Sequence, residues 1–363
     1  MRFPEFSGEW KMATFGDIAK GFDYGMNAAA KSFDGNNKYI RITDIDEVSS
    51  QYLYDDVVSP DGELEDRYLV KENDILLART GASTGKSYLY RNSDGKLYFA
   101  GFLIRANIYK HNSYFVFSQL HTLRYKKWIS VMSARSGQPG INSQEYASFP
   151  VYTTSLQEED KIATFLKLLD ERIITQNKII EKLQSLIRGL AVTLTTKGNF
   201  NTAISQCLEC HSSTLQESEV LPNGLYKVFG ANGLVGYTDV PQMNGDAILV
   251  IKDGSGVGTV SYAQGKFSAI GTLNYLTVID NNDLRYLYFA LSVFNFQAYK
   301  TGMAIPHIYF KDYGKAKIYC PPLAEQKHIA NVLDKLESKL LLEQGILASF
   351  NWQKRYLLGQ MLI

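Results

Sequence analysis

The sequence contains one unit twice, and the two copies are 167 residues apart. The best-matched stretch begins at Ile141 in the first copy and at Ile308 in the second. Without a gap, the copies share a residue at Tyr146/Tyr313, Tyr152/Tyr319, Leu156/Leu323, Glu158/Glu325, Ile162/Ile329, Ala163/Ala330, Leu166/Leu333 and Leu169/Leu336. Such self-similarity at a fixed interval indicates a duplicated structural unit. Since 363 residues also exceed what one hydrophobic core usually supports, we expect two domains.

Each copy ends in a long stretch with the periodicity of a helix. Apolar residues recur at alternating spacings of four and three, which is typical of a coiled-coil seam. The seam residues are Ile162, Leu166, Leu169, Ile173, Ile180, Leu183 and Ile187 in the first copy and Ile329, Leu333, Leu336, Leu340 and Leu347 in the second. One polar residue interrupts each series at the matched place, Gln176 in the first and Glu343 in the second. The pattern predicts two long helices.

Chain connectivity restricts how these helices can pair. The first runs from domain one to domain two and the second begins at domain two, so their seams can pair only in antiparallel fashion. The alternative, in which each helix packs on its own domain, leaves the matched heptads unexplained. We therefore predict an α+β fold with a pseudo-twofold internal repeat. Its parts are β-rich domains at 1–155 and 199–320 and long antiparallel coiled-coil helices at 156–198 and 321–363.

The regions before the helices differ in sequence but share one element. Both contain an apolar run followed by a glycine-punctuated turn, at 74–86 and at 246–259. Short alternating runs rich in Tyr, Phe, Val and Ile favour antiparallel strands around it. Residues 81–87 resemble a phosphate-binding loop, but that loop needs four residues between its glycines and a helix after it. Here three residues separate Gly81 from Gly85 and a strand-like run follows, so a glycine turn between two strands is the better interpretation.

Basic residues are concentrated in one part of the first domain. Residues 79–135 contain ten Lys and Arg and a single acid, Asp94, although the net charge of the whole chain is only +1. Such a block can line a surface that contacts nucleic-acid phosphates. A solvated face that balances the acidic segment 1–78 is an equally good interpretation. The second domain is nearly neutral, with 8 basic and 9 acidic residues between 199 and 320.

The cysteine and histidine content argues against a metal or haem site. Cys207, Cys210 and His211 have the spacing of a c-type haem attachment site, which belongs to exported proteins, but the N-terminus shows no export signal. A zinc site would need a second ligand pair at a suitable spacing, and the sequence offers none. No run approaches about 18 apolar residues. We therefore expect a cytoplasmic protein with no membrane span and no metal.

With these motifs set aside, the sequence resembles the specificity subunits of type I restriction-modification enzymes. The resemblance rests on the opening stretch 2–10, on the two glycine hairpins, and on a helix-start motif that occurs twice, at 156–163 and at 323–330. It implies that the β-rich parts are target-recognition domains, each reading one half of a split, asymmetric DNA site. It also implies that the helices bind two adenine methyltransferase subunits and that ATP-dependent endonuclease subunits join the complex. The chain itself would be non-catalytic and hold no cofactor, with methyl donor, ATP and magnesium in the partners.

The resemblance also indicates which loops would approach double-stranded DNA. In the first domain these loops carry Arg79, Thr80, Ser83, Lys86, Arg135, Ser136, Gln138 and Asn142. In the second they carry Lys252, Ser255, Lys300, Thr301 and His307. Arginine, glutamine and asparagine side chains can pair with base edges, whereas Lys86 and Lys300 suit phosphates. Arg105 and Lys126, from the basic block, complete the predicted DNA-binding set.

Two other hypotheses belong to different functional classes. A two-headed protein-interaction scaffold would bind ligands other than DNA, and co-purification with a methyltransferase would count against it. A nucleotide-using enzyme built on the glycine loops would bind ATP, and Lys86→Ala would abolish that binding. We prefer the DNA-specificity hypothesis, because duplication, two dissimilar domains and a basic block fit a reader of two half-sites.

Overall fold

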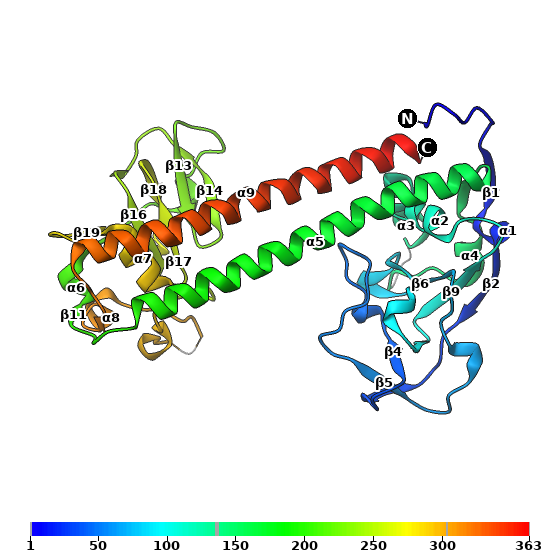
Figure 1. Cartoon of the computed structure of the whole chain (residues 1–363), viewed down its shortest axis with the longest axis horizontal. Helices are drawn as coiled ribbons and strands as arrows, with labels where there is room; N and C mark the ends of the chain where they lie inside the picture. Colours follow the sequence, from blue (N-terminus) through cyan, green and yellow to red (C-terminus); the bar gives the residue numbers. More distant parts are fainter. Residues whose placement is uncertain (1, 135–137, 303, 363) are drawn as a thin grey trace. The chain divides into compact units, whose positions relative to one another are not determined.

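The computed structural model describes residues 2–134, 138–302 and 304–362, and Figure 1 labels its elements. The chain divides into two compact units. Unit 1 comprises Met1–Gln176 and Ile346–Ile363, and unit 2 comprises Asn177–Gly345. The long helices α5 (Leu156–Thr195) and α9 (Leu323–Met361) each contribute one part to unit 1 and the other part to unit 2. The predicted domain boundaries at 155, 198 and 320 lie at or near the ends of the long helices, whereas the compact units divide within those helices. The predicted boundaries therefore stay a prediction.

Unit 1 is built around an antiparallel sheet with the strand order β2-β9-β6-β7. Its strands are β1 (Lys11–Thr14), β2 (Ala19–Tyr24), β3 (Ala29–Ser32), β4 (Lys38–Ile40), β5 (Val58–Asp61), β6 (Asp74–Ala78), β7 (Ser87–Leu89), β8 (Leu97–Phe99), β9 (Leu103–Ile108) and β10 (Pro150–Thr153). Its shorter helices are α1 (Phe15–Ile18), α2 (Ser113–Gln119), α3 (Leu123–Met132) and α4 (Ser143–Ala147). Single-turn 3-10 helices lie at Ile42–Asp44, Asp66–Tyr68, Gly81–Ser83 and Asn92–Asp94. All five residues of β6 are buried, which explains its apolar run.

Unit 2 repeats this sheet, in the order β12-β19-β16-β17, and contains a second four-stranded sheet, β14-β13-β18-β15, whereas the other sheets described in unit 1 have two strands each, β1-β10, β3-β5 and β4-β8. Its strands are β11 (Thr202–Ala203), β12 (Leu208–Ser212), β13 (Tyr226–Gly230), β14 (Gly233–Thr238), β15 (Met243–Asn244), β16 (Ala247–Ile251), β17 (Val260–Ala263), β18 (Lys266–Ala269), β19 (Leu273–Val278) and β20 (Lys317–Ile318). Its helices are α6 (Ile204–Cys207), α7 (Leu284–Ser292) and α8 (Phe310–Tyr313), with 3-10 turns at Glu217–Glu219 and Phe296–Tyr299. β16 is buried at all five positions, as β6 is in unit 1. Two sheet-containing domains with two long helices confirm the predicted α+β class and its internal repeat.

Each unit brings together opposite ends of the two long helices. In unit 1, Leu166 near the start of α5 shares a hydrophobic core with Leu357 near the end of α9. In unit 2, Ala191 near the end of α5 shares a core with Leu333 near the start of α9. The start of one helix therefore packs near the end of the other in both units, which confirms the antiparallel arrangement.

The predicted seam residues are buried or half-buried at every position. The first of them, Ile162 and Leu166, also pack on buried residues of their own domain such as Phe115. The first turns of α5 and α9 thus do pack on their own domains, as the alternative proposed. Over their full lengths, however, the two helices are antiparallel. The matched polar residues Gln176 and Glu343 are only 7% and 6% exposed.

The repeated helix-start motif has a structural role in both copies. Glu159 is fully buried and accepts hydrogen bonds from the backbone N–H of Asn112, at 2.9 Å, and of Thr154, at 3.1 Å. Its counterpart Gln326 accepts one from the N–H of Asp283 at 2.8 Å and donates one to the carbonyl of Pro321 at 2.8 Å. The residues Asn112 and Asp283 are the N-caps of α2 and α7. The motif therefore ties the start of each long helix to the domain before it.

The haem-like motif is divided between a helix end and a strand. Cys207 ends α6, whereas Cys210 and His211 lie on β12, where neighbouring side chains point to opposite faces. Within the described residues, no cluster of three or more His, Cys, Asp or Glu side chains is arranged to hold a metal ion. Across the same residues, no helix combines the length and the apolar character needed to span a bilayer.

Candidate nucleic-acid interface

The glycine hairpin of unit 1 is a tight turn between β6 and β7. Gly81 and Gly85 have φ angles of +71° and +93°, which favour glycine. The Lys86 N–H donates to the carbonyl of Ser83 at 3.0 Å, and the Gly85 N–H donates to the carbonyl of Ala78 at 3.0 Å. Only a single 3-10 turn and a strand follow the first glycine, so the structure lacks the helix that a phosphate-binding loop requires. The predicted glycine turn is confirmed.

A second predicted loop packs against this hairpin. The Ile141 N–H donates to the carbonyl of Arg79 at 2.9 Å, and the Gly81 N–H donates to the carbonyl of Pro139 at 2.9 Å. Thr80 and Gly140 also form an isolated β-bridge. The described part of the 135–142 turn and the hairpin, which are far apart in sequence, therefore form one continuous surface.

Unit 2 contains the same surface. The Ile308 N–H donates to the carbonyl of Lys252 at 2.9 Å, and the Gly254 N–H donates to the carbonyl of Pro306 at 2.9 Å. Gly258 takes the place of Gly85, with a φ angle of +88° and an N–H bond to the carbonyl of Ile251 at 2.9 Å. The backbone hydrogen bonds are thus repeated, whereas the side chains that they present differ between the two units.

Buried tyrosines fix the hairpin of unit 1 from below. The Tyr146 hydroxyl donates to the carbonyl of Ala78 at 2.6 Å and accepts from the Gly85 N–H at 3.1 Å. The Tyr125 hydroxyl, on α3, donates to the carbonyl of Gly85 at 3.1 Å. Burial raises the pKa of both phenols, so both stay protonated and keep their donors. The hairpin is therefore held in one conformation before any ligand arrives.

Arg79 is held in a defined orientation on this surface. Its Nε donates to the carbonyl of Gly101 at 3.1 Å, and its guanidinium carbon lies 5.0 Å from the centre of the Tyr24 ring. The Tyr24 hydroxyl in turn accepts a hydrogen bond from the Ser143 N–H at 3.2 Å. Within the described ranges, the two terminal nitrogens of Arg79 have no hydrogen-bond partner. They form a fork that can bind two acceptors of one base or phosphate.

The other predicted residues of the first domain take different places. Gln138 is exposed, and its amide nitrogen lies beside Gly81, 3.2 Å from where a Cβ there would stand. Thr80, Ser83 and Lys86 are half-buried in the hairpin, and the Lys86 ammonium lies 3.8 Å from the carboxylate of Glu47. Lys126 is exposed on α3. Arg135 and Ser136 lie outside the described residues.

Two predicted side chains have structural partners instead. The carboxamide oxygen of Asn142 accepts from the Glu145 N–H at 2.9 Å, so Asn142 is the N-cap of α4. The pattern of an asparagine followed three residues later by a glutamate could have shown this capping box. Arg105, on β9, is 15% exposed, donates to Asp23 at 2.8 Å and lies beside Asp74. Its charge is satisfied within the sheet, and the structure does not bring it to the hairpin surface.

In unit 2 the predicted residues gather around the second hairpin. Thr301 and His307 exchange two backbone hydrogen bonds of 2.9 Å, and Asp253 forms a β-bridge with His307. Thr301 and His307 thus lie beside the hairpin that carries Lys252 and Ser255. Lys252 and Lys300 are half-buried there, whereas Ser255 and Thr301 are exposed.

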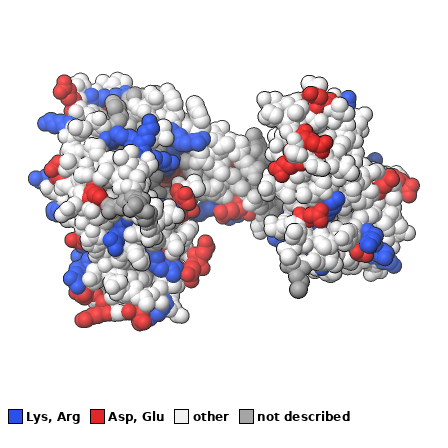
Figure 2. All heavy atoms as spheres, turned by 180° about the vertical axis from the view of Figure 1, so that it is seen from behind, with Lys and Arg blue, Asp and Glu red and all other residues white. Residues whose placement is uncertain are grey.

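Sequence reasoning missed two aromatic residues beside Arg79. Tyr24 lies under its guanidinium, and Phe102 is 57% exposed and accepts the Arg79 N–H with its carbonyl at 3.1 Å. Tyr24 ends β2 and Phe102 lies in the turn before β9, 55 and 23 residues away along the chain, and no local pattern marks them. On the face of unit 1 shown in Figure 2, at the left of the view, Lys and Arg atoms gather in the upper part.

The fold and the paired loops define a duplicated, two-domain α+β protein that presents the same hairpin surface twice. The chain matches the family described as type I restriction modification DNA specificity domain, over residues 7–185 and 208–350. Because the match covers most of the chain, this protein belongs to that family. The predicted resemblance is confirmed, and with it the assignment to a family of specificity subunits rather than enzymes.

Two curated relatives have similar sequences. Over 114 residues, or 31% of this chain and 28% of the relative, the chain is 25% identical to the specificity subunit of the type I restriction enzyme EcoprrI from Escherichia coli. Over 208 residues, or 55% and 44%, it is 25% identical to the specificity subunit of the type I restriction enzyme MjaVIII from Methanocaldococcus jannaschii. The matches thus span less than half the length of these relatives.

Solved structures support the fold. The S subunit of a type I restriction-modification system from M. genitalium superposes with a TM-score of 0.69 and 16% identity, covering 98% of this chain and 96% of that chain. A chain from a type I R-M system, determined to explain complex assembly and conformational transition, gives a TM-score of 0.54 and 14% identity and covers 96% of each chain. At these identities the likeness concerns the fold alone.

Proposed function

We propose that this chain recognises a bipartite, asymmetric double-stranded DNA site, with one domain reading each half. The observation that carries the proposal is the duplicated hairpin surface, which has the same backbone hydrogen bonds in both units but different side chains. Arg79 in unit 1 corresponds to Lys252 in unit 2. One backbone frame with two sets of side chains suits a protein that reads two different half-sites.

The anchored fork of Arg79 suits base reading in the first domain. Its Nε and its ring contact hold the guanidinium plane, so little conformational entropy is lost when the terminal nitrogens bind. A fork of this kind matches O6 and N7 of guanine in the major groove. The lysine at the equivalent position is a flexible point charge, which suits a phosphate better than a specific base.

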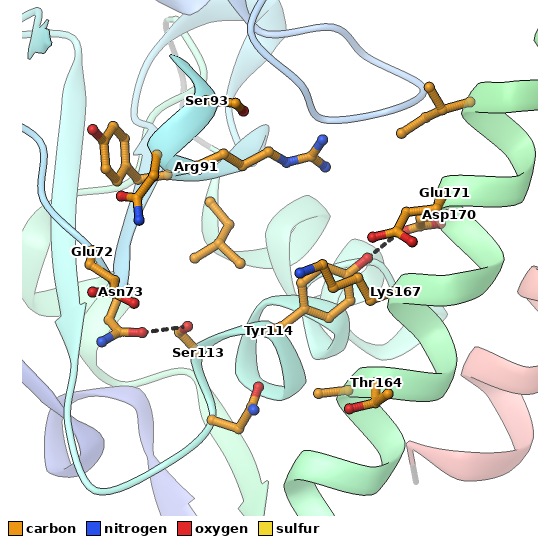
Figure 3. A pocket seen from close by; sticks show the side chains of 16 residues that line it. Glu72, Asn73, Arg91, Ser93, Ser113, Tyr114, Thr164, Lys167, Asp170 and Glu171 are labelled. Carbon is orange, nitrogen blue, oxygen red and sulfur yellow. Dashed lines mark hydrogen bonds between the residues drawn. The ribbon is translucent and has the colours of Figure 1, made fainter. Parts of the chain in front are cut away.

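We further propose that two methyltransferase subunits dock beside the long helices. A hollow of about 630 Å³ lies between α5 and the edge of the unit 1 domain. Figure 3 shows Arg91 extending into it, with Lys167, Asp170 and Glu171 on the α5 wall. The Tyr114 hydroxyl donates to Asp170 across the hollow.

Unit 2 has a hollow of about 820 Å³ at the equivalent place. Arg285 stands where Tyr114 does and bonds to Asp334 and Glu337 of α9, and Glu337 is the counterpart of Asp170. Large apolar side chains are also exposed along both helices, at Phe165, Leu168, Ile179, Leu186, Leu341, Leu342, Trp352 and Tyr356. Similar hollows beside similar helices favour two copies of one partner.

The catalytic functions would then belong to the partners. ATP-dependent endonuclease subunits would join the same complex, and the methyl donor, ATP and magnesium would bind to the partner subunits. The nucleotide-enzyme alternative has little support here, because the glycine turn precedes a strand.

The test is to delete the gene in its host and map the methylated adenines of the genome. We expect methylation at one split motif to disappear and to return when the full chain is supplied again. An unchanged methylation pattern would refute the proposal. If the methylation pattern were unchanged and the chain also failed to co-purify with a methyltransferase, a protein-interaction scaffold that binds no DNA would be favoured.

Two variants test the assignment of the halves. Arg79→Ala should relax the sequence preference at one base pair of one half-site, at a cost of about 1–3 kcal/mol in binding, while the other half-site stays unchanged. Inserting four residues, about one helical turn, after Leu183 should change the gap between the half-sites and leave the bases of both unchanged. A change of bases after the insertion would contradict the role of the helices as a spacer.

A further inference from the structure

Unit 1 contains a hollow in which the end of α9 meets the glycine hairpin. The hollow has a volume of about 590 Å³ and is lined by the hairpin, by α3 and by the last turns of α9. Its basic lining residues are Lys86, Lys126, Lys354 and Arg355, and the single acid among its lining residues is Glu47. The two cations of α9 come from the opposite end of the sequence to the hairpin, so the tertiary fold alone places them here.

The four cations differ in how far they are neutralised. The Lys354 ammonium lies 2.6 Å from the Asp170 carboxylate, and both side chains are largely buried, so this pair offers little net charge. Among the residues that the structure describes, the ionic contact of Lys86 is a distant one with Glu47, whose side chain is 83% exposed. Lys126 and Arg355 are exposed and have no ionic partner within the described ranges. They supply most of the charge that an approaching anion would meet.

These cations stand on rigid supports. A Cβ at Gly85 would lie 2.9 Å from Ile129, which shows how closely α3 packs on the hairpin. At the other wall, Leu357, Leu358 and Met361 of α9 are buried in the core of unit 1. Because both helices are packed on the unit 1 core, the backbone positions from which Lys126 and Arg355 project are fixed before binding.

The hollow adjoins the surface proposed to read DNA. Thr84 lines the hollow and also donates from its hydroxyl to the carbonyl of Gly81 at 2.8 Å. The same hairpin contacts the turn at Pro139, through the N–H of Gly81 at 2.9 Å and the hydroxyl of Thr84 at 3.4 Å. A duplex lying on the hairpin would therefore continue over Lys126 and Arg355, where its phosphates would find unpaired cations.

We infer that the last turns of α9 are part of the DNA-binding surface of the first domain, with Arg355 and Lys126 binding phosphates that flank the half-site. This inference rests on the proposed function and adds to it a segment outside the β-rich domain. Phosphate contacts position a protein on the duplex without reading its sequence. The long helix would thus hold DNA as well as connect the domains.

The experiment uses the full chain in complex with its methyltransferase subunits. Arg355→Gln, Lys126→Gln and the double variant are compared with Arg67→Gln, which removes one charge at an exposed residue outside the hollow. Affinity for a duplex that carries the split site is measured over a series of salt concentrations, and the methylated adenines are mapped.

We expect each single substitution in the hollow to reduce the slope of log affinity against log salt concentration by about 0.9, and the double variant by about twice that. The methylated motif should not change, and Arg67→Gln should behave as the wild type. A wild-type slope in the double variant would overturn the inference alone. Loss of the methyltransferase subunits from the variant complex would also overturn it, because the hollow would then be a protein-docking site. If the wild-type complex itself failed to bind the split site, the proposed function would fall as well.

Discussion

The buried carboxylate of Glu159 gives a sharp test of how the long helix is joined to the first domain. Glu159→Ala removes the acceptor of two backbone N–H groups, those of Asn112 and Thr154, and a 2.9 Å contact with His111. Each donor left without a partner in a buried place costs about 1–3 kcal/mol. The neighbouring His111 side chain is 22% exposed, so water can reach part of the space left by the carboxylate, and we expect a loss of about 2–4 kcal/mol in the free energy of unfolding.

The second repeat supplies the matched comparison. Gln326 fits its site because Pro321 has no N–H and offers only a carbonyl, to which the glutamine amide donates. At the equivalent place in unit 1, Thr154 has a backbone N–H. In Glu159→Gln the side-chain amide nitrogen, which is a donor, would therefore face another donor. One carboxamide oxygen would remain to accept, and we expect a loss of about 1–2 kcal/mol, smaller than for Glu159→Ala.

All three tryptophans, Trp10, Trp128 and Trp352, lie in unit 1, so their fluorescence during urea unfolding reports on this unit. Glu171→Gln, at an exposed acid on the same helix, should stay within about 0.5 kcal/mol of the wild type. Equal losses for Glu159→Gln and Glu159→Ala, or a loss below about 1 kcal/mol for the alanine variant, would refute the reasoning.

Three further predictions concern unit 1 and use the same fluorescence assay. Gly85→Ala combines a positive φ with a close approach to Ile129 and should cost about 1–3 kcal/mol, whereas Gly359→Ala, in open space on α9, should be neutral or stabilising. Tyr146→Phe should cost about 1–2 kcal/mol, because the buried hydroxyl bridges the Ala78 carbonyl and the Gly85 N–H, which would keep only their bond to each other; an unchanged midpoint would contradict the role of Tyr146 in holding the hairpin. Burial opposes ionisation of Glu158, but hydrogen bonds from Arg2, Thr154 and Trp10 outweigh it and lower its pKa. Its contribution is therefore complete above the unfolded pKa of 4.5 and is lost as the pH falls through the lower folded pKa, so Glu158→Gln should flatten the acid side of the stability profile.

The sequence by itself determined the duplication, the two long helices and the glycine turns. These features depend on local rules. Helical periodicity is set by 3.6 residues per turn, and Gly81 and Gly85 mark backbone angles that other residues adopt only with strain. The helix-start motif could also be aligned from the sequence, because it is a local pattern that occurs twice. The sequence did not show that Glu159 of this motif binds the N-cap of α2.

Only the tertiary structure decided which charged side chains are exposed together around the hairpin of unit 1. The basic block predicted Arg105 and Lys126 alike, but cross-strand pairing gives Arg105 to Asp23 and leaves Lys126 exposed. It also brought Arg355 from the end of the chain to the hairpin near residue 85, and Tyr24 from β2 under Arg79. Contacts between residues far apart in sequence depend on packing and on strand register. No local pattern encodes them, so the site became visible only once the chain was folded.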